Sequence, residues 1–252
     1  MKFTRLSSME EYILSRDFVS LDELCSVFGK SKSTVRRDVS DLVSNGLIEK
    51  VYGGVKAVKH SRKLVSFSER IIKMPDEKLV IGKLAAEYVE DGDIIFIDSG
   101  TTTLNMIPFL ANVGNITVLT NSMYVINRCM EYPNLKIISF GGLLNLETAS
   151  FTADYCSLDH IKRFNIRKAF MAATGVSIEN GATNASPGEM NIKNLITKIS
   201  DTCFLLVDAT KFDRSALLTY ADLPDFRYVI TDRKPPDTYI SFFAEHNIIC
   251  RF

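Results

Sequence analysis

From residue 64 to the end of the chain, β-prone runs alternate with segments of helical periodicity, and no other feature limits the fold as strongly. Strands that alternate with helices form a parallel sheet with helices on both faces. We therefore predict a doubly wound, mostly parallel α/β domain over residues 76–252. The expected strands span residues 94–98, 117–120, 136–140, 169–173, 203–208, 228–231 and 248–250. The expected helices lie near residues 76–90, 102–111, 122–131, 154–163, 187–200 and 236–246.

Residues 1–58 follow a different pattern, which predicts three short helices. The spacing of Leu6, Met9 and Ile13 indicates a first helix over residues 7–16. A capping box formed by Ser20 and Glu23 starts the second helix, which ends at residue 29. Ser31 caps the third helix, and residues 45–46, Asn-Gly, form its left-handed stop. Two short helices joined by a tight glycine turn are typical of a helix-turn-helix.

The third helix is expected to carry a basic face opposite its apolar stripe. Val35 and Val39 lie on the core side, whereas Arg36 and Arg37 fall between about 100° and 200° away around the helix. Arginine can donate two hydrogen bonds to guanine in the major groove, and hydroxyl groups can hold phosphates. Asp38 and Asp41 argue mildly against this interpretation, although Asp41 lies four residues after Arg37 and could fix that side chain. The pattern nevertheless predicts a recognition helix that binds double-stranded DNA.

Residues 47–58 contain two short β-prone runs around Gly53 and Gly54, which predict a hairpin wing after the recognition helix. The basic stretch over residues 59–63 could rest on the DNA backbone or be a solvated linker. We expect a winged helix-turn-helix domain over residues 1–58 and a linker over residues 59–75. The expected DNA contacts are Ser31, Ser33, Thr34, Arg36, Arg37, Ser40, Tyr52 and Lys56.

The charge distribution agrees with a polyanion partner for the first part of the chain. The whole chain holds 30 Lys+Arg and 30 Asp+Glu, yet residues 1–63 carry 12 basic and 8 acidic groups. Residues 28–63 alone carry 9 basic and 3 acidic groups. A basic module on an acidic body favours nucleic acid as the partner of that module. The alternative is a chance imbalance on a solvated face.

Composition excludes several classes of protein. With 46% hydrophobic and 24% charged residues, the chain is neither disordered nor fibrous. The opening residues are too polar for a signal peptide, and no apolar run approaches the roughly 20 residues that span a bilayer. We therefore expect a cytoplasmic protein. The five cysteines are scattered, which indicates neither a disulfide framework nor a zinc site, so we expect no metal and no cofactor.

Four polar segments follow predicted strands of the second domain. They are Asp98 to Thr103, Thr120 to Ser122, Gly141-Gly142, and Asp208 to Lys211. Ligands of open α/β sheets bind at the carboxyl ends of the strands, and amides at a helix start can hold an anion. Taken singly, such segments are mostly structural. Their shared position predicts a phosphate cradle with sugar-hydroxyl partners around it.

Two sets of motifs resemble the DeoR family of bacterial sugar-metabolism repressors. In the first domain they are residues 31–39 (SKSTVRRDV), 46–48 (GLI) and 52–55 (YGGV), with Tyr52 where the family usually has His and Val55 where it usually has Ala. In the second they include Glu69-Arg70, Lys78, Asp91-Gly92-Asp93, residues 98–102 (DSGTT), Gly175, Gly181 and residues 230–232 (ITD). The family often has Gly where this chain has Thr152.

The resemblance implies a phosphosugar sensor similar in fold to ribose-5-phosphate isomerase and glucosamine-6-phosphate deaminase. It implies that the sensor binds a phosphorylated sugar, with Glu189 as a hydroxyl partner. The expected ligand contacts are Asp98, Ser99, Gly100, Thr101, Thr102, Thr103, Asn121, Gly141, Gly142, Glu189 and Lys211.

The same resemblance separates a regulator from an enzyme. An isomerase needs a positioned carboxylate base, and the related isomerases carry an acidic Asp-Gly-Ala-Asp-Glu run where this chain has residues 173–177 (ATGVS). Glu189 alone remains as a base. Residues 186–189 (SPGE) also form a capping box at the start of the helix expected near residues 187–200, and a capping-box glutamate is more often structural. We therefore expect no catalytic residues and no membrane partner. The expected function is a homo-oligomeric DNA-binding repressor of a carbohydrate-metabolism operon, controlled by a phosphorylated sugar. The alternative is a phosphosugar isomerase-like or deaminase-like enzyme with an appended helical module.

Overall fold

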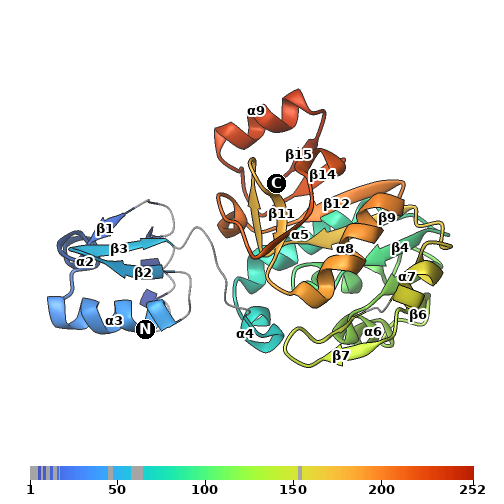
Figure 1. Cartoon of the computed structure of the whole chain (residues 1–252), viewed down its shortest axis with the longest axis horizontal. Coiled ribbons are helices and arrows are strands. Elements are labelled where there is room, and N and C mark those ends of the chain that lie inside the picture. The colour runs from blue at the N-terminus through green and yellow to red at the C-terminus, as the bar shows by residue number, and fades with distance from the viewer. Residues whose placement is uncertain are drawn as a thin grey trace. The chain divides into compact units, whose positions relative to one another are not determined.

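The computed structural model describes residues 5, 6, 8, 9, 12, 13, 16, 18–44, 48–57, 65–152 and 155–252, and the chain divides into two compact units, residues 1–63 and 64–252 (Figure 1). In the first unit, residues 5, 6, 8, 9, 12 and 13 are helical, within and just before the predicted first helix. The next helices are α2 (Leu21–Phe28) and α3 (Lys32–Ser44). These elements confirm the predicted helix-turn-helix.

The caps of these helices match the sequence prediction only in part. Ser20 Oγ accepts from the Glu23 amide at 3.1 Å, and Gly29 ends α2 with a positive φ of 58°. The Glu23 carboxylate instead accepts from the Tyr12 hydroxyl at 2.9 Å, so the predicted capping box is half formed. Ser31 Oγ accepts from the Thr34 amide at 3.4 Å at the start of α3. The predicted stop at residues 45–46 lies outside the described residues.

A three-stranded antiparallel sheet forms the wing, in the order β1 (Val19–Ser20), β3 (Gly54–Ala57), β2 (Ile48–Val51). Val51 pairs with Gly54, so the turn consists of Tyr52 and Gly53, and the predicted Gly-Gly turn is wrong by one residue. Gly54 belongs to strand β3. A Cβ there would lie 2.2 Å from the Val19 carbonyl oxygen, which explains why this position is glycine. Strand β1 was not predicted.

The second unit contains a seven-stranded, wholly parallel sheet, as predicted. Its strands are β4 (Ile94–Ile97), β5 (Ile116–Thr120), β6 (Leu135–Ser139), β9 (Lys168–Ala172), β12 (Thr202–Leu206), β14 (Tyr228–Ile230) and β15 (Ile249–Arg251). Their spatial order is β15-β14-β12-β9-β4-β5-β6. The direction of winding reverses between β4 and β9, and ligands of such sheets bind at this switch point.

Helices cover both faces of this sheet, which confirms the doubly wound prediction (Figure 1). Helices α5 (Pro75–Ala86) and α6 (Met123–Cys129) and the 3-10 helix η1 (Thr103–Leu110) share one core with Ile95 and Ile97 of β4. Phe96 belongs to the other core, beneath α7 (Tyr155–Ile161), α8 (Pro187–Ile199) and α9 (Asp237–Glu245). Successive side chains of a strand face opposite sides, so each buried strand serves two cores.

Several short elements of this unit were not predicted. Strands β10 (Gly175–Ser177), β11 (Gly181–Asn184) and β13 (Leu218–Ala221) form an antiparallel sheet, and β7 (Leu143–Asn145) pairs with β8 (Ser150–Thr152). Helix α4 (Phe67–Ile71) lies inside the stretch that was expected to be a linker. Short 3-10 helices occur at η2 (Ala209–Lys211) and η3 (Leu223–Asp225). None of the described helices is long and apolar enough to cross a membrane.

Candidate functional site

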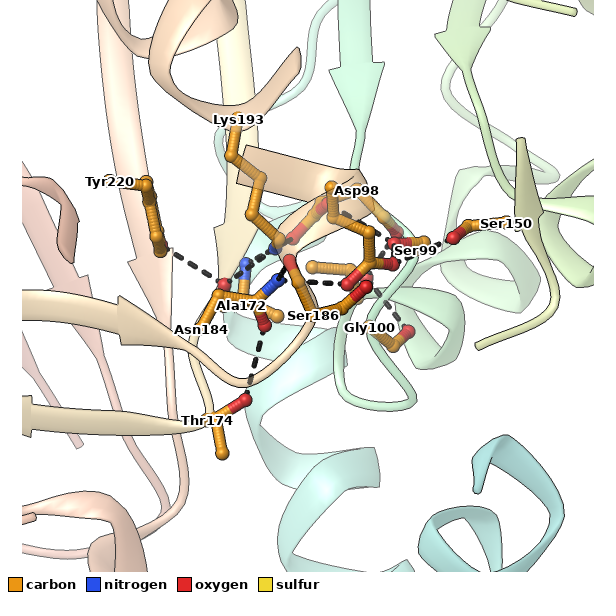
Figure 2. Close-up of polar contacts among 12 residues, drawn as sticks. Asp98, Ser99, Gly100, Ser150, Ala172, Thr174, Asn184, Ser186, Lys193 and Tyr220 are labelled. Carbon is orange, nitrogen blue, oxygen red and sulfur yellow. Dashed lines mark hydrogen bonds and ion pairs between the residues drawn. The ribbon is translucent and has the colours of Figure 1, made fainter. Parts of the chain in front are cut away.

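The switch point of the sheet holds a buried ion pair between Asp98, at the end of β4, and Lys193, on α8 (Figure 2). Asp98 Oδ2 also accepts from the Ala172 amide at 2.9 Å. The Ala172 carbonyl accepts from Lys193 Nζ and from the Tyr220 hydroxyl, both at 3.0 Å. Asp98 was predicted to contact the ligand, but in this structure its carboxylate joins α8 to the ends of β4 and β9.

Glu189 forms a second buried network beside this pair. Its Oε1 accepts from Ser99 Oγ at 2.6 Å and from Ser150 Oγ at 2.8 Å, and its Oε2 accepts from Asn184 Nδ2 at 2.8 Å. Burial disfavours the carboxylate, but the charge of Lys193 and these three hydrogen bonds outweigh burial and lower the pKa of Glu189. We call Ser99, Ser150, Asn184 and Glu189 the Glu189 network.

The Glu189 network contradicts the capping box predicted at the start of α8. Ser186 is the N-cap residue, yet its side chain accepts no capping hydrogen bond. The Glu189 side chain extends instead to Ser99 after β4, to Ser150 at the start of β8 and to Asn184 at the end of β11. Glu189 is therefore part of the strand-end site, where the family resemblance also placed it.

The predicted Asp98 to Thr103 segment serves two purposes. Thr103 Oγ1 donates to the Asp98 and Gly100 carbonyls, at 2.7 and 2.9 Å, and so holds the turn together. A Cβ at Gly100 would lie 2.3 Å from the Ala172 Cβ, which explains the glycine. Among the described residues, the Thr101 and Thr102 hydroxyls have no hydrogen-bond partner.

The helix after this segment differs from the prediction. Residues 103–110 form a 3-10 helix, whereas an α-helix was expected over residues 102–111. Pro108 lies inside this helix and has no amide hydrogen to donate to residue 104, which removes one α-helical hydrogen bond. The Asp98 to Thr103 segment therefore leads into a 3-10 helix and not into the expected α-helix.

Asn121 carries an unpaired acceptor in a fully buried position. Its Nδ2 donates to the Phe151 carbonyl at 3.1 Å. Its Oδ1 has no hydrogen-bond partner among the described residues. An unsatisfied buried acceptor costs about 1–3 kcal/mol, so a donor supplied by a ligand would stabilise this site.

Gly141 and Gly142 lie apart from these networks. Both are exposed, and a Cβ at Gly141 would meet no heavy atom within 4 Å. No neighbouring group of the described structure therefore explains why position 141 is glycine. Gly142 has a φ of 143°, a conformation that other residues rarely adopt, so its glycine is explained by the backbone.

A group of cations adjoins the end of β12. Arg70, Lys73, Lys78 and Lys211, which we call the cation cluster, lie on α4, after α4, on α5 and on η2. Lys211 Nζ lies 4.0 Å from Asp208 Oδ2. Among the described residues, neither Lys73 nor Lys78 has a carboxylate within ion-pair distance. Four cations around one carboxylate form a site suited to an anion.

Lys78 is the most telling member of the cation cluster, because its side chain is only 4% exposed. Its Nζ donates to the Arg70 carbonyl at 2.5 Å. Burial lowers the pKa of Lys78 to about 8, and the neighbouring charges of Lys211, Arg70 and Lys73 act in the same direction against the attraction of Asp208. A bound anion would remove much of this penalty.

Sequence reasoning did not assign several residues of these networks. Lys193 lies four residues after Glu189 on α8, and this spacing, which places both side chains on one helix face, could have identified it. Lys78 and Arg70 were noted only as part of the family resemblance. Ser150 and Asn184 lie on strands that were not predicted, so no sequence signal pointed to them.

The exposed face of α3 carries the predicted DNA contacts Ser33, Arg36, Arg37 and Ser40, while Val35, Val39 and Leu42 are buried. Asp38 lies on the buried side, where its carboxylate accepts two hydrogen bonds from Arg5, at 2.8 and 3.1 Å. One of the two negative charges that argued against a recognition helix, that of Asp38, is therefore neutralised away from the exposed face, whereas Asp41 is half-buried.

The other predicted DNA contacts lie at the start of α3 and in the wing. Ser31 Oγ is within 3.0 Å of the hydroxyls of Ser33 and Thr34. Tyr52 is fully exposed at the tip of the wing. Lys56 forms an ion pair with Glu49 at 3.0 Å, so its charge is partly balanced.

Family models match both units of the chain. A model described as the DeoR-like helix-turn-helix domain matches residues 5–61, and one described as the DeoR C terminal sensor domain matches residues 73–233. Together they cover most of the chain.

Individual relatives agree with the family models. The chain is 43% identical to the HTH-type transcriptional regulator IolR of Bacillus subtilis over 250 residues, 98% of each chain. It is 28% identical to the glycerol-3-phosphate regulon repressor of Escherichia coli over 97% of this chain and 96% of that protein. Among solved structures, a D-ribose-5-phosphate isomerase in complex with phospho-erythronic acid matches with a TM-score of 0.42 and 19% identity, over 56% of this chain and 55% of that chain.

Proposed function

Because this chain belongs to the DeoR family of HTH-type transcriptional regulators, we propose that a phosphorylated sugar bound in its second unit controls its binding to operator DNA. The predicted class, a DNA-binding transcriptional regulator, is confirmed by the family. The identity of the effector, its contacts and the repressor mode of action belong to the proposal.

The cation cluster is the observation that carries the phosphate part of the proposal. A buried lysine without a carboxylate partner is costly, and here three further cations surround it. A phosphate group carries up to two negative charges and accepts several hydrogen bonds, so it offsets these charges as no neutral sugar can. We assign the phosphate to Arg70, Lys78 and Lys211.

The polar groups without partners support the sugar part of the proposal. Asn121 Oδ1 would accept a hydrogen bond from a sugar hydroxyl. The hydroxyls of Thr101 and Thr102 can both donate and accept. Sugar hydroxyls suit such a mixture of donors and acceptors.

We propose that the site binds without catalysis. Glu189 is the only candidate base that sequence analysis retained, and it already accepts three hydrogen bonds beside Lys193. Asp98 is engaged with Lys193 and Ala172. A base needs a free lone pair within reach of the substrate proton. A turnover assay with sugar phosphates tests the enzyme alternative, and detectable isomerisation would support it.

For the DNA part, we propose that Arg36 and Arg37 read base edges in the major groove while the wing tip at Tyr52 contacts the duplex beside it. Their exposure on one face of α3, with Asp38 turned inward, supports this arrangement. A homo-oligomer that binds paired half-sites completes the proposal. Sedimentation of the full chain with and without operator tests the oligomeric state.

Calorimetry on the full chain tests the effector. The probes are glycerol 3-phosphate, D-ribose 5-phosphate and D-fructose 1-phosphate, each beside its unphosphorylated form. We expect at least one phosphorylated probe to bind, and its unphosphorylated form to bind at least tenfold more weakly. Lys78→Gln should abolish this preference, whereas Lys83→Gln, an exposed lysine on the same helix, should keep it. Equal affinity for a sugar and its phosphate would contradict the proposal.

A further inference from the structure

Helix α4 is the first described element after residues 58–64, the stretch that joins the two units in sequence. Arg70, near the end of α4, turns back toward the start of this unit. Its Nε donates to the Val65 carbonyl at 3.1 Å. The side chain of Arg70 therefore holds the first described backbone of the second unit.

The same side chain belongs to the cation cluster. Arg70 is half-buried, and burial lowers its pKa while the charges of Glu189 and Asp98 oppose the shift. Its backbone carbonyl accepts from Lys78 Nζ. Thus two cations of the cluster hold α4 in place. Arg70 does so through its hydrogen bond to the Val65 carbonyl, and Lys78 through its hydrogen bond to the Arg70 carbonyl.

A second set of contacts fixes the other end of α4. The Phe67 ring stacks on the Tyr124 ring of α6, with centroids 4.1 Å apart and planes 6° from parallel. The Phe67 amide donates to the Glu147 carbonyl at 2.8 Å, in the connection between β7 and β8. Strand β8 contributes Ser150 to the Glu189 network. The Arg70 end of α4 is therefore tied to the cation cluster, and the Phe67 end is tied to α6 and to the connection between β7 and β8.

We infer that Arg70, besides contacting the phosphate, couples the effector site to the chain leading to the DNA-binding unit. This inference rests on the proposed function. A phosphate in the cation cluster competes with the Val65 carbonyl for the Arg70 guanidinium, and with the Arg70 carbonyl for Lys78. An anion accepts more strongly from a cation than a neutral carbonyl does, so binding favours release of α4 and Val65.

A substitution that keeps the charge separates this role from simple anion binding. Lysine at position 70 retains a cation for the cluster but lacks the guanidinium Nε–H that bonds to Val65. Arg128→Lys is the matched control, because the Arg128 side chain is 42% exposed on α6 and, within the described part of the chain, forms an ion pair with its near neighbour Glu131. The operator is a duplex selected from a random pool by the full-length parent.

We expect Arg70→Lys to bind this operator about tenfold more weakly than the parent when no phosphosugar is present, and Arg128→Lys to bind like the parent. Hydrogen exchange of the amides of residues 66–71 should be faster in Arg70→Lys. With the best-binding phosphorylated probe of the panel, added at a concentration that saturates each protein, the operator affinity of Arg70→Lys should respond at least tenfold less than that of the parent.

Tyr124→Ala provides a second variant outside the effector site. It removes the stack on Phe67, so we expect faster exchange over residues 66–71 and a reduced operator response with unchanged affinity for the probe. Parental operator affinity and response in both variants would overturn the inference. If no probe binds the parent, the proposed function fails. The operator affinities of Arg70→Lys and the parent without phosphosugar can still be compared, and equal affinities would show that Arg70 does not act on the DNA-binding unit.

Discussion

The Arg5 guanidinium and the Asp38 carboxylate form two hydrogen bonds, 2.8 and 3.1 Å long, that join the first helical segment to α3. Asp38 is fully buried, whereas Arg5 is 23% exposed. Arg5 balances the charge of Asp38, which lies on the buried side of α3. The pair orients α3 and does not involve the exposed arginines of that helix.

Removing one partner of this pair should cost more stability than removing both. Arg5→Met leaves a buried carboxylate without its cation, whereas Arg5→Met combined with Asp38→Leu leaves no buried charge. We expect a lower melting temperature for the single variant than for the double variant, measured by circular dichroism. A double variant that melts below Arg5→Met would contradict this reading of the pair.

Arg37→Ala should weaken operator binding by about 1–3 kcal/mol if the side chain reads a base. The salt dependence of binding should change little, because a base contact releases few counterions. Gel-shift titration at several salt concentrations measures both quantities. Arg128→Ala, an exposed arginine in the second unit, is the control and should bind operator like the parent.

Anion binding should weaken as the pH rises through about 8, the pKa of Lys78. Below that pH Lys78 is charged and attracts the anion. Above it, binding requires uptake of a proton, so the affinity for the anion should fall by up to about tenfold per pH unit. Sulfate is the probe, since its charge is constant over this range. Calorimetry between pH 7 and 9.5 should show the loss in the parent and in Lys83→Gln, and a flatter profile in Lys78→Gln.

The same pKa has a consequence for stability without ligand. The pKa of Lys78 lies below its ordinary value of 10.5, so its contribution to stability is fully present above pH 10.5 and is lost as the pH falls through about 8. Lys78→Gln should therefore be more stable than the parent at pH 7. Urea unfolding at pH 7 measures the difference, and a less stable variant would argue that Lys78 is compensated by another group.

Asn121→Ala should separate binding of the sugar from binding of the anion. The phosphorylated probe should bind about tenfold more weakly, because the variant lacks the buried acceptor for a hydroxyl. Sulfate carries no such hydroxyl, so its affinity should stay at the parental value. An equal loss for both ligands would place Asn121 in the structural framework alone.

Glu189→Gln should destabilise the chain by about 1–3 kcal/mol, because the amide of glutamine brings donors to positions where Ser99, Ser150 and Asn184 already donate. Glu179→Gln, at an exposed position, is the control. The pKa of Glu189 lies below its ordinary value of 4.5, so its contribution is present above pH 4.5 and is lost as the pH falls further. Urea unfolding at pH 7 and pH 4 measures both effects.

Much of the fold followed from local sequence patterns. Residues 94–97 are a short apolar run bounded by turn residues, which is typical of a strand buried on both faces. The stripe of Val35, Val39 and Leu42 likewise determined which face of α3 is exposed. These features depend on residues that are close in sequence, so a periodic pattern reports them.

The short strands β10, β11 and β13 could not be predicted in the same way, because a strand of three or four residues has too few alternations to be recognised. Pairing with distant neighbours defines them.

The proposed effector site depended most on tertiary structure. Arg70 and Lys78 lie on the consecutive helices α4 and α5, but Lys211 lies far along the chain on η2, and the fold of the whole unit brings its charge to theirs. The same winding turned Glu189 from a predicted cap into the centre of a network with Ser99, Ser150 and Asn184. Local sequence determines which side chains a helix exposes, but the distance between side chains on different elements depends on how the whole chain folds, and so does the burial that lowers the pKa of Lys78.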